Sequence, residues 1–264
     1  MPSRARRLFA NIICGIIPSK TTRDKVRAKI CYFEKILKYK EFVKQYAKEN
    51  NIPYKSKLCF GYGCYNAIII LNQQWVFKFP LWAYRMSENK KLATKEKRIV
   101  DAFKNISPIK IPNVELIEWN GVVVRKYEYI PGKVLTDFTE EQIVKHISYF
   151  AKELANFLYI IAKHDPKEIQ DLKPSKKLKP GFLYGWCQCD IWANFMIDPK
   201  TMKILGFIDW ELAEFGDFKG TIHLALLRWR KHGKGTSRLV IEIMEQYAKL
   251  YYSNNHTKHV SQNV

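Results

Sequence analysis

The sequence has few acidic residues for its size. Only 25 Asp and Glu accompany 45 Lys and Arg among 264 residues, which gives a formal net charge of +20 at pH 7. Such an imbalance predicts an anionic partner, such as nucleic acid, a membrane surface or a phosphorylated ligand. The excess is concentrated early in the chain, because residues 1–57 hold 15 Lys and Arg against 4 Asp and Glu.

Cysteine, glycine and long apolar runs are also scarce. The six cysteines form no C-x-x-C pair, so we expect reduced thiols in a cytosolic protein rather than a disulfide framework. The 12 glycines exclude a fibrous repeat. No uncharged apolar run reaches the roughly 18 residues that a spanning helix needs, which argues against an integral membrane protein. No recognition module accompanies the positive charge, so nucleic-acid binding is not favoured.

The order of local patterns predicts a strand-rich half followed by a helical half. Short strands are expected at 56–60, 67–71, 75–79, 114–118 and 122–129, with a helix from 87 to about 103. Thr139 and Gln142 form a capping box, and the residues behind it predict one buried helix face. That face comprises Ile143, Ile147, Phe150, Leu154, Phe157 and Ile161. A hairpin of 195–198 with 204–209, further helices and a frayed polar tail follow.

Two aspartates are the centre of the predicted site. Asp190 precedes the 195–209 hairpin and Asp209 ends it, so that the two carboxylates are expected close together. One carboxylate can accept a hydroxyl proton while the other holds a metal ion, as phosphoryl transfer requires. The cation candidate is Lys78, which alternates with Trp75, Phe77 and Phe79 and therefore faces the other side of its strand. Such a lysine needs an anionic partner, and Glu88 and Glu96 of the following helix are the candidates. The resemblance described next favours Glu96.

Several blocks, in the correct order over about residues 54–250, resemble the aminoglycoside phosphotransferase/choline kinase-like family, which is related to the protein kinases. Ile208-Asp209-Trp210-Glu211 followed by Gly216-Asp217 is the strongest block. The weaker blocks are Gly61-Tyr62-Gly63, Phe77-Lys78-Phe79-Pro80, Lys95-Glu96, Tyr127–Gly132 and Asp190–Asn194.

The resemblance implies an α+β, two-lobed protein-kinase-like fold with a β-rich N-lobe and a mainly helical C-lobe. It also implies an ATP- and Mg²⁺-dependent kinase of alcohol groups. Asp190 would be the catalytic base, and Asn194 and Asp209 the metal ligands. The residues implied for nucleotide binding are Lys78, Glu96, Gly61, Gly63, Tyr127 and Tyr129.

The expected organisation is a basic, partly helical segment at 1–53, the N-lobe at 54–130, the C-lobe at 131–252 and the tail at 253–264. The chain departs from the family pattern at two points. Gln188 and Cys189 replace the usual His-Gly, and Asn194 follows Asp190 by four positions where the family has five. A non-catalytic pseudokinase that binds a partner therefore remains an alternative.

The acceptor is predicted from charge. A polycationic aminoglycoside or choline needs an acidic or aromatic pocket, whereas this chain is strongly basic. A short stretch from Phe9 to Ile30 also resembles a segment of bacterial enzymes that build lipooligosaccharide and other surface glycans. A sugar of such a glycan is thus the expected acceptor, with aminoglycoside and choline or ethanolamine as alternatives. We expect a cytoplasmic protein. Two readings of residues 1–30 stay open: they contact an anionic membrane at its inner face, or residues 8–17 pack against the folded lobes while the cations lie in solvent.

Overall fold

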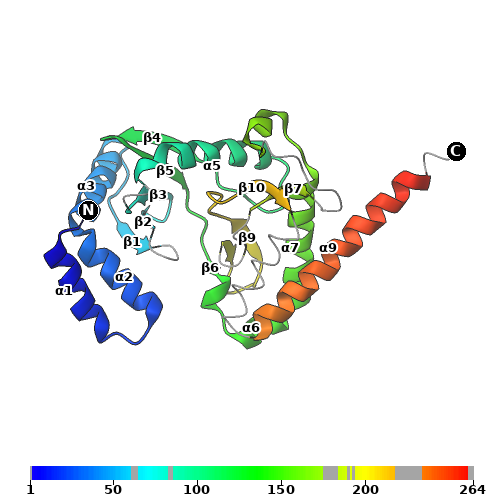
Figure 1. The fold of residues 1–264 in the computed structure, drawn as a ribbon, viewed down its shortest axis with the longest axis horizontal. Helices are drawn as coiled ribbons and strands as arrows, with labels where there is room; N and C mark the ends of the chain where they lie inside the picture. Colours follow the sequence, from blue (N-terminus) through cyan, green and yellow to red (C-terminus); the bar gives the residue numbers. More distant parts are fainter. Residues whose placement is uncertain are drawn as a thin grey trace. The chain divides into compact units, whose positions relative to one another are not determined.

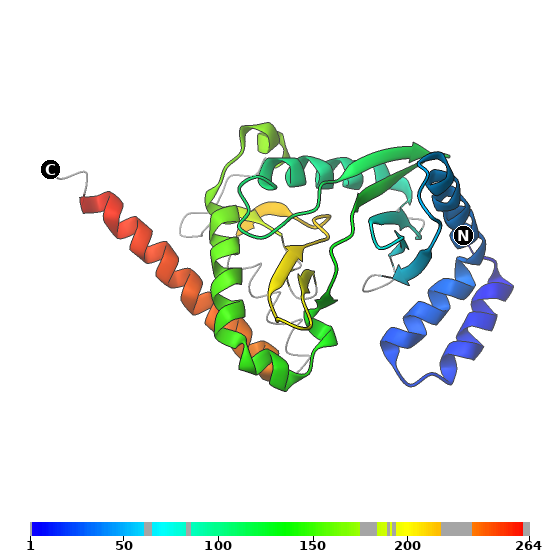
Figure 2. The same ribbon diagram turned by 180° about the vertical axis from the view of Figure 1, so that it is seen from behind.

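The computed structural model describes residues 2–60, 65–82, 86–174, 184–188, 191, 194–217 and 234–260. The chain folds into two compact units (Figures 1 and 2). Unit 1 comprises Met1–Lys97 and Val114–Tyr129, and unit 2 comprises Arg98–Asn113 and Ile130–Val264. The last boundary falls between Tyr129 and Ile130.

Unit 1 contains a five-stranded antiparallel sheet. Three helices precede the sheet in the sequence, and a fourth, α5, begins between its third and fourth strands. Its helices are α1 (Arg4–Gly15), α2 (Lys20–Cys31), α3 (Phe33–Glu49) and the first part of α5 (Asn89–Phe103). Its strands are β1 (Ser56–Phe60), β2 (Asn66–Leu71), β3 (Trp75–Pro80), β4 (Glu115–Trp119) and β5 (Val122–Glu128). The strand order in the sheet is β1-β2-β3-β5-β4. The predicted strands and the predicted helix ending at Phe103 are therefore confirmed to within a few residues.

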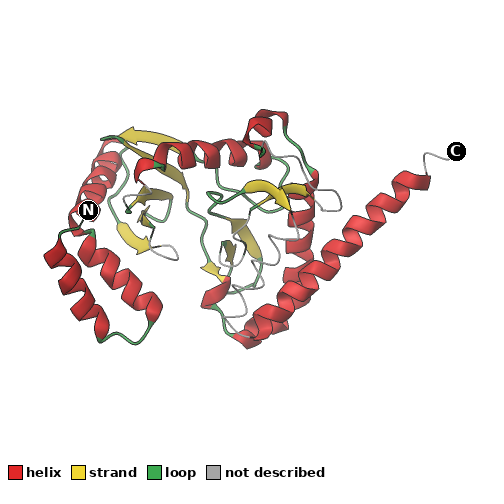
Figure 3. Cartoon of the chain, viewed as in Figure 1, coloured by secondary structure: helices red, strands yellow, loops and turns green. Residues whose placement is uncertain are grey.

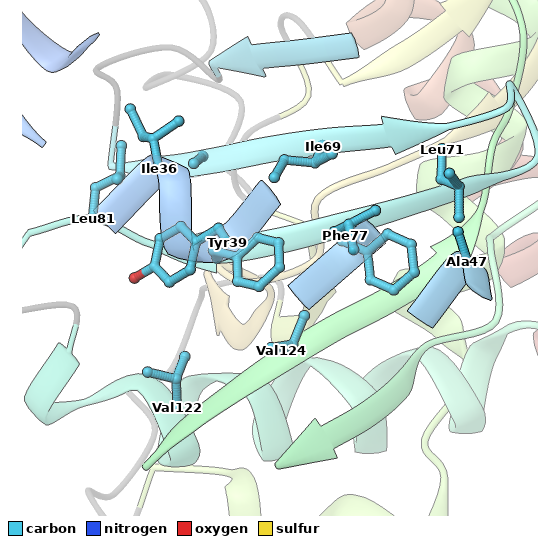
Figure 4. Packing of buried hydrophobic residues seen from close by; sticks show 12 residues of the cluster. Ile36, Tyr39, Ala47, Ile69, Leu71, Phe77, Leu81, Val122 and Val124 are labelled. Carbon is cyan, nitrogen blue, oxygen red and sulfur yellow. The ribbon is translucent and has the colours of Figure 1, made fainter. Parts of the chain in front are cut away.

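An aromatic cluster joins α3 to one face of this sheet (Figure 4). Tyr39 of α3 stacks on Phe79 of β3 with ring centroids 4.3 Å apart, and its hydroxyl donates to the carbonyl of Pro80 at 2.7 Å. Phe77 lies on the same face and contacts Tyr46 of α3 edge-on. Burying each such side chain contributes roughly 1.5–3 kcal/mol. The basic segment before residue 54 thus supplies part of the core of unit 1.

Unit 2 is mainly helical, with short strand pairs (Figure 3). Its described helices are the rest of α5, η2 (Leu135–Asp137), α6 (Glu140–Lys145), α7 (Ile147–Lys163), η3 (Lys167–Leu172) and α9 (Lys234–Val260). Its strands are β6 (Lys133–Val134), β7 (Tyr184–Cys187), β8 (Phe195–Ile197), β9 (Ile204–Phe207) and β10 (Glu214–Asp217). They form the antiparallel sheets β6-β8-β9 and β7-β10. The predicted hairpin is therefore present as β8 and β9.

The long amphipathic pattern after Thr139 forms two helices. Thr139 and Gln142 make the predicted capping box at the start of α6. The helix breaks at His146, and α7 begins at Ile147. All six apolar residues of the predicted face are nevertheless buried, and each is at most 5% exposed. Because α9 continues to Val260, the chain is helical over residues 253–260, where a frayed tail was expected.

Gly132 follows the boundary between the units and has a φ of +129°, which L side chains rarely adopt. A Cβ atom added there would lie 2.6 Å from the carbonyl oxygen of Ile197 in β8. Glycine is therefore required where the chain passes β8 to enter β6.

The structure also bears on two exclusions made from the sequence. None of the helices in the described parts of the chain is long and apolar enough to cross a membrane. Cys14, Cys31, Cys59 and Cys187, the cysteines among the described residues, take part in no disulfide there.

Candidate active site

The predicted ion pair between Lys78 and Glu96 is present in unit 1. Lys78 extends from β3 on the face opposite the aromatic cluster, and its Nζ lies 3.7 Å from Oε2 of Glu96 in α5. Both side chains are almost fully buried, with exposed fractions of 2% and 3%. A charged lysine is stable in such a place only beside a compensating anion. The sheet therefore holds a cation in an interior position.

A third buried charge, Arg125, completes this group and was missed by the sequence analysis. Arg125 of β5 is the direct cross-strand partner of Lys78, and its Nη1 donates to Oε2 of Glu96 at 2.8 Å. Only 1% of its side chain is exposed. A signal was available in the run Val122-Val123-Val124-Arg125, since an arginine after three valines in an interior strand requires a partner.

Asn89 fixes the helix that carries Glu96. Its side-chain amide donates to the carbonyl of Val123 at 3.0 Å and accepts from the Val123 N–H at 2.6 Å. The pairing of β3 with β5 ends at Arg125. Beyond that point, the side chain of Asn89 makes the two hydrogen bonds to β5 that the backbone of a neighbouring strand would make. These two hydrogen bonds set the position of α5, and so of Glu96, against the sheet.

Asn194 and Asp209 flank the open end of the β8–β9 hairpin in unit 2. The N–H of Ile208 donates to the carbonyl of Asn194 at 2.8 Å, which extends the pairing of Phe195 with Phe207 by one residue pair. Asp209 is the next residue, so it lies beside Asn194 despite the shortened spacing from Asp190. Both residues are partly exposed.

The backbone at Asp209 is in the left-handed region, with a φ of 62°. A non-glycine residue held in such a region costs on the order of 1–3 kcal/mol, and these residues are concentrated at functional sites. Gln188, which stands where the family pattern has His, is fully buried, and its side-chain N–H donates to the Asp209 carbonyl at 2.5 Å. The glutamine that replaces the histidine of the family pattern therefore donates a hydrogen bond to the backbone carbonyl of Asp209.

Trp210 anchors Asp209 in the core of unit 2. Its indole is 1% exposed, and its Nε1–H donates to the carbonyl of Phe207 at 3.3 Å. The ring stacks on Phe103 and contacts Phe157 of α7 edge-on. Phe103 is the last residue of α5 and belongs to unit 2 with the rest of Arg98–Asn113.

Of the remaining predicted site residues, the structure describes Tyr127 and Tyr129. Tyr127 is buried in β5 opposite Val76, and Tyr129 donates its N–H to the carbonyl of Gln74 at 2.8 Å. Asp190, Gly61 and Gly63 lie outside the described residues. The structure thus pairs Lys78 with Glu96 in unit 1. In unit 2 it places the backbone of Asn194 opposite Ile208, the residue before Asp209.

The donors in unit 2 suit a hard cation. A carboxylate and an amide oxygen are ligands that Mg²⁺ accepts, whereas thiol or imidazole ligands would indicate a softer metal. Among the described residues, no cluster of three or more His, Cys, Asp or Glu side chains has the arrangement of a metal site. The fit to Mg²⁺ therefore rests on Asp209 and Asn194.

Comparisons with known proteins identify the fold. No family model and no curated protein matches the sequence. Among solved structures, the GDP complex of aminoglycoside 2′-phosphotransferase-IIIa is 15% identical, with a TM-score of 0.61 over 79% of this chain and 82% of that chain. The streptomycin–ATP complex of APH(2″)-IIa is 14% identical, with a TM-score of 0.57 over 79% and 83%.

A third structure extends the likeness beyond aminoglycoside enzymes. The macrolide 2′-phosphotransferase MphH from Brachybacterium faecium is 12% identical, with a TM-score of 0.51 over 78% of this chain and 81% of that chain. At these identities the likeness establishes the fold. The chain has the α+β, protein-kinase-like fold of aminoglycoside and macrolide phosphotransferases, as the sequence predicted.

Proposed function

We propose that the protein is a phosphotransferase that uses ATP and Mg²⁺ to phosphorylate a hydroxyl group of a small molecule or of a glycan sugar. The observation that carries this proposal is the buried Lys78, held by Glu96 on a fold whose solved examples include complexes with ATP and GDP. Burying the charge of a lysine is costly unless an anion lies beside it, and Glu96 supplies that anion here.

Each residue has a role that follows from its chemistry. Lys78 would contact the α- and β-phosphates, and Glu96 would orient it. Asp209 and Asn194 would hold Mg²⁺, which when bound offsets the negative charge of the phosphates. Asp190 would orient the acceptor hydroxyl and accept its proton. Gly61 and Gly63 would approach the phosphates, and the backbone of Tyr127–Tyr129 would contact the base.

The acceptor that we propose is an anionic sugar of a bacterial surface glycan such as lipopolysaccharide. The net charge of +20 supports this choice, since a basic surface attracts a phosphorylated or acidic sugar and repels a polycation. An aminoglycoside acceptor is the second candidate. It is favoured by the neighbouring structures, which include complexes with streptomycin and with gentamicin.

A transfer assay tests the proposal. The purified full chain is incubated with γ-labelled ATP or GTP, with and without Mg²⁺, and with phosphorylated heptose, neutral hexoses, kanamycin or choline. We expect Mg²⁺-dependent labelling of a sugar, and its loss in Asp190→Asn. Labelling of kanamycin alone would select the second candidate. Nucleotide binding without labelling of any acceptor would indicate a pseudokinase, and absence of nucleotide binding would refute the proposal.

A further inference from the structure

Most of the large apolar side chains of helix α1, together with that of its C-cap residue Ile16, are exposed. Leu8, Phe9, Ile12 and Ile16 are 62%, 57%, 64% and 82% exposed. Their spacing places them along one side of the helix. The side that packs on α2 is made of small residues such as Ala10 and Cys14, which are fully buried. Elsewhere the chain does the opposite, since the predicted apolar face of α7 is entirely buried.

The apolar surface continues from α1 to the start of α3. Figure 2 shows α1 and α2 side by side as a hairpin next to α3. A groove of about 720 Å³ runs along these helices, and Phe9, Ile30 and Phe33 line it together with Arg6 and Lys29. Phe33 is itself 55% exposed. A contiguous exposed apolar surface with a polar rim marks a site of interaction with a protein or a membrane.

The charge around this surface selects between those partners. The segment 2–31 contains eight Lys and Arg and a single acidic residue, Asp24. Arg4 and Arg7, in the first turns of α1, are exposed, and Arg4 precedes Leu8 by one helical turn. Basic residues beside a stripe of Phe, Leu and Ile are the pattern of helices that lie in a membrane interface. Cations beside an anionic leaflet each raise binding about five-fold.

We infer that the exposed side of α1, with Phe33 and the cations around it, is a docking surface for an anionic lipid membrane. The 12-residue helix is about 18 Å long, and a hydrocarbon core is about 30 Å thick, so α1 lies in the interface and does not cross it. Leu8, Ile12 and Ile16 enter the boundary of the acyl chains, while Arg4 and Arg7 contact lipid phosphates. This inference goes beyond the proposed reaction and holds for any acceptor.

Co-sedimentation of the full chain with vesicles tests the inference, in the absence of nucleotide and acceptor. The vesicles contain phosphatidylglycerol and phosphatidylcholine in equal parts, or phosphatidylcholine alone. The test variant is Ile12→Glu with Ile16→Glu. Its matched control is Ile241→Glu with Met244→Glu on α9, where the side chains are 53% and 44% exposed. A second test variant combines Arg4→Gln and Arg7→Gln. Its matched control combines Lys44→Gln and Lys48→Gln on α3, where the side chains are also exposed.

We expect the unaltered chain to bind the anionic vesicles, and to bind them less as NaCl rises from about 0.1 M to about 1 M. The Ile12/Ile16 and Arg4/Arg7 variants should bind at least ten-fold more weakly, while both controls stay within about two-fold. Failure to bind anionic vesicles would overturn the inference. Binding of the Ile12/Ile16 variant as strong as that of the unaltered chain would also overturn it. So would a dimer of the unaltered chain in analytical sedimentation that the Ile12/Ile16 substitutions dissociate, because the surface would then be an interface between two copies. Because no nucleotide is present, failure here is distinct from failure of the proposed reaction.

Discussion

Arg125 and Lys78 are direct cross-strand partners that share the carboxylate of Glu96, and the arginine makes the shorter contact. Oε2 of Glu96 lies 2.8 Å from Nη1 of Arg125 and 3.7 Å from Nζ of Lys78. The carboxylate is therefore fixed mainly by a bond to the neighbouring strand. Lys78 makes the longer of these two contacts.

Removing the shared carboxylate should cost more stability than removing Arg125. In Glu96→Gln, two buried cations lose the anion between them, and a loss of about 3–5 kcal/mol in the free energy of unfolding is expected. In Arg125→Met, Glu96 keeps Lys78 as a partner, so the loss should be smaller. Urea denaturation of both variants measures the order. An Arg125→Met variant that is the less stable of the two would show that Arg125 has a larger structural role than proposed.

Two buried strand lysines provide a matched test of the role of Lys78. Lys126 is also buried in the sheet and paired with a glutamate, since its Nζ lies 2.7 Å from Oε2 of Glu115. It lies against the ring of Trp75, on the other face of the sheet. Lys78→Met should reduce kcat/KM for nucleotide about 100-fold or more, while Lys126→Met should affect mainly stability. Equal kinetic losses in folded protein would remove Lys78 from the mechanism.

Asp209 and Asn194 should differ in the size of their effect on Mg²⁺. Asp209→Asn replaces a carboxylate by a neutral amide, and Mg²⁺-dependent nucleotide binding should fall below detection. Asn194→Ala removes a neutral ligand, so we expect nucleotide binding to weaken about ten-fold and to recover partly at high Mg²⁺ concentration. Titration calorimetry at several Mg²⁺ concentrations measures both. Unchanged binding in Asn194→Ala would show that its amide is not a ligand.

Gln188 should act on Asp209 through the backbone. Gln188→Ala removes the bond to the Asp209 carbonyl in a buried place, and a loss of about 1–3 kcal/mol in stability is expected. Because the strained backbone of Asp209 then loses a support, KM for the Mg²⁺–nucleotide should rise as well. Gln188→His, which restores the residue type of the family pattern, provides the comparison. If KM stays constant while stability falls, Gln188 is only a core residue.

Tyr39 predicts a loss of stability at high pH. Burial raises the pKa of its hydroxyl from 10.0 to about 12. The neutral hydroxyl therefore stabilises the folded state fully below pH 10, and this contribution is lost as the pH rises from 10 to about 12. Relative to Tyr39→Phe, the unaltered chain should lose up to about 2 kcal/mol over that range. Urea denaturation of the unaltered chain and of Tyr39→Phe at several pH values tests this.

Local patterns predicted most of the elements of this fold. Burial determines both the spacing of apolar residues in α7 and the alternation of Lys78 with aromatic residues in β3. The sequence alone therefore predicted this helix and this strand. The breaks at Tyr32 and His146 were not predicted. The apolar spacing of the predicted face continues across His146, and segment 1–53 was predicted only as partly helical. The tertiary context, and not the propensity of either residue, decides where those helices end.

The site was predicted only in part, for a related reason. Lys78 was found from the alternation in its strand and Glu96 from the family pattern, and their ion pair is present. Arg125, Asn89 and Gln188 act through pairing with residues that are 29, 34 and 21 positions away. Such contacts depend on strand register, which no local pattern specifies. The roles proposed for Asp190, Asn194 and Asp209 remain predictions for the variants above.

Gly132 has a consequence for any survey of random substitutions in this protein. Its φ of +129° and the missing space beside Ile197 make every other residue type unfavourable there. A screen that records only activity would rank Gly132 with the catalytic residues, although Gly132 is needed only because the backbone passes close to Ile197 there. A parallel measurement of protein abundance would separate the two groups, because substitutions at Gly132 should lower abundance and activity together, whereas Asp209→Asn should lower activity alone.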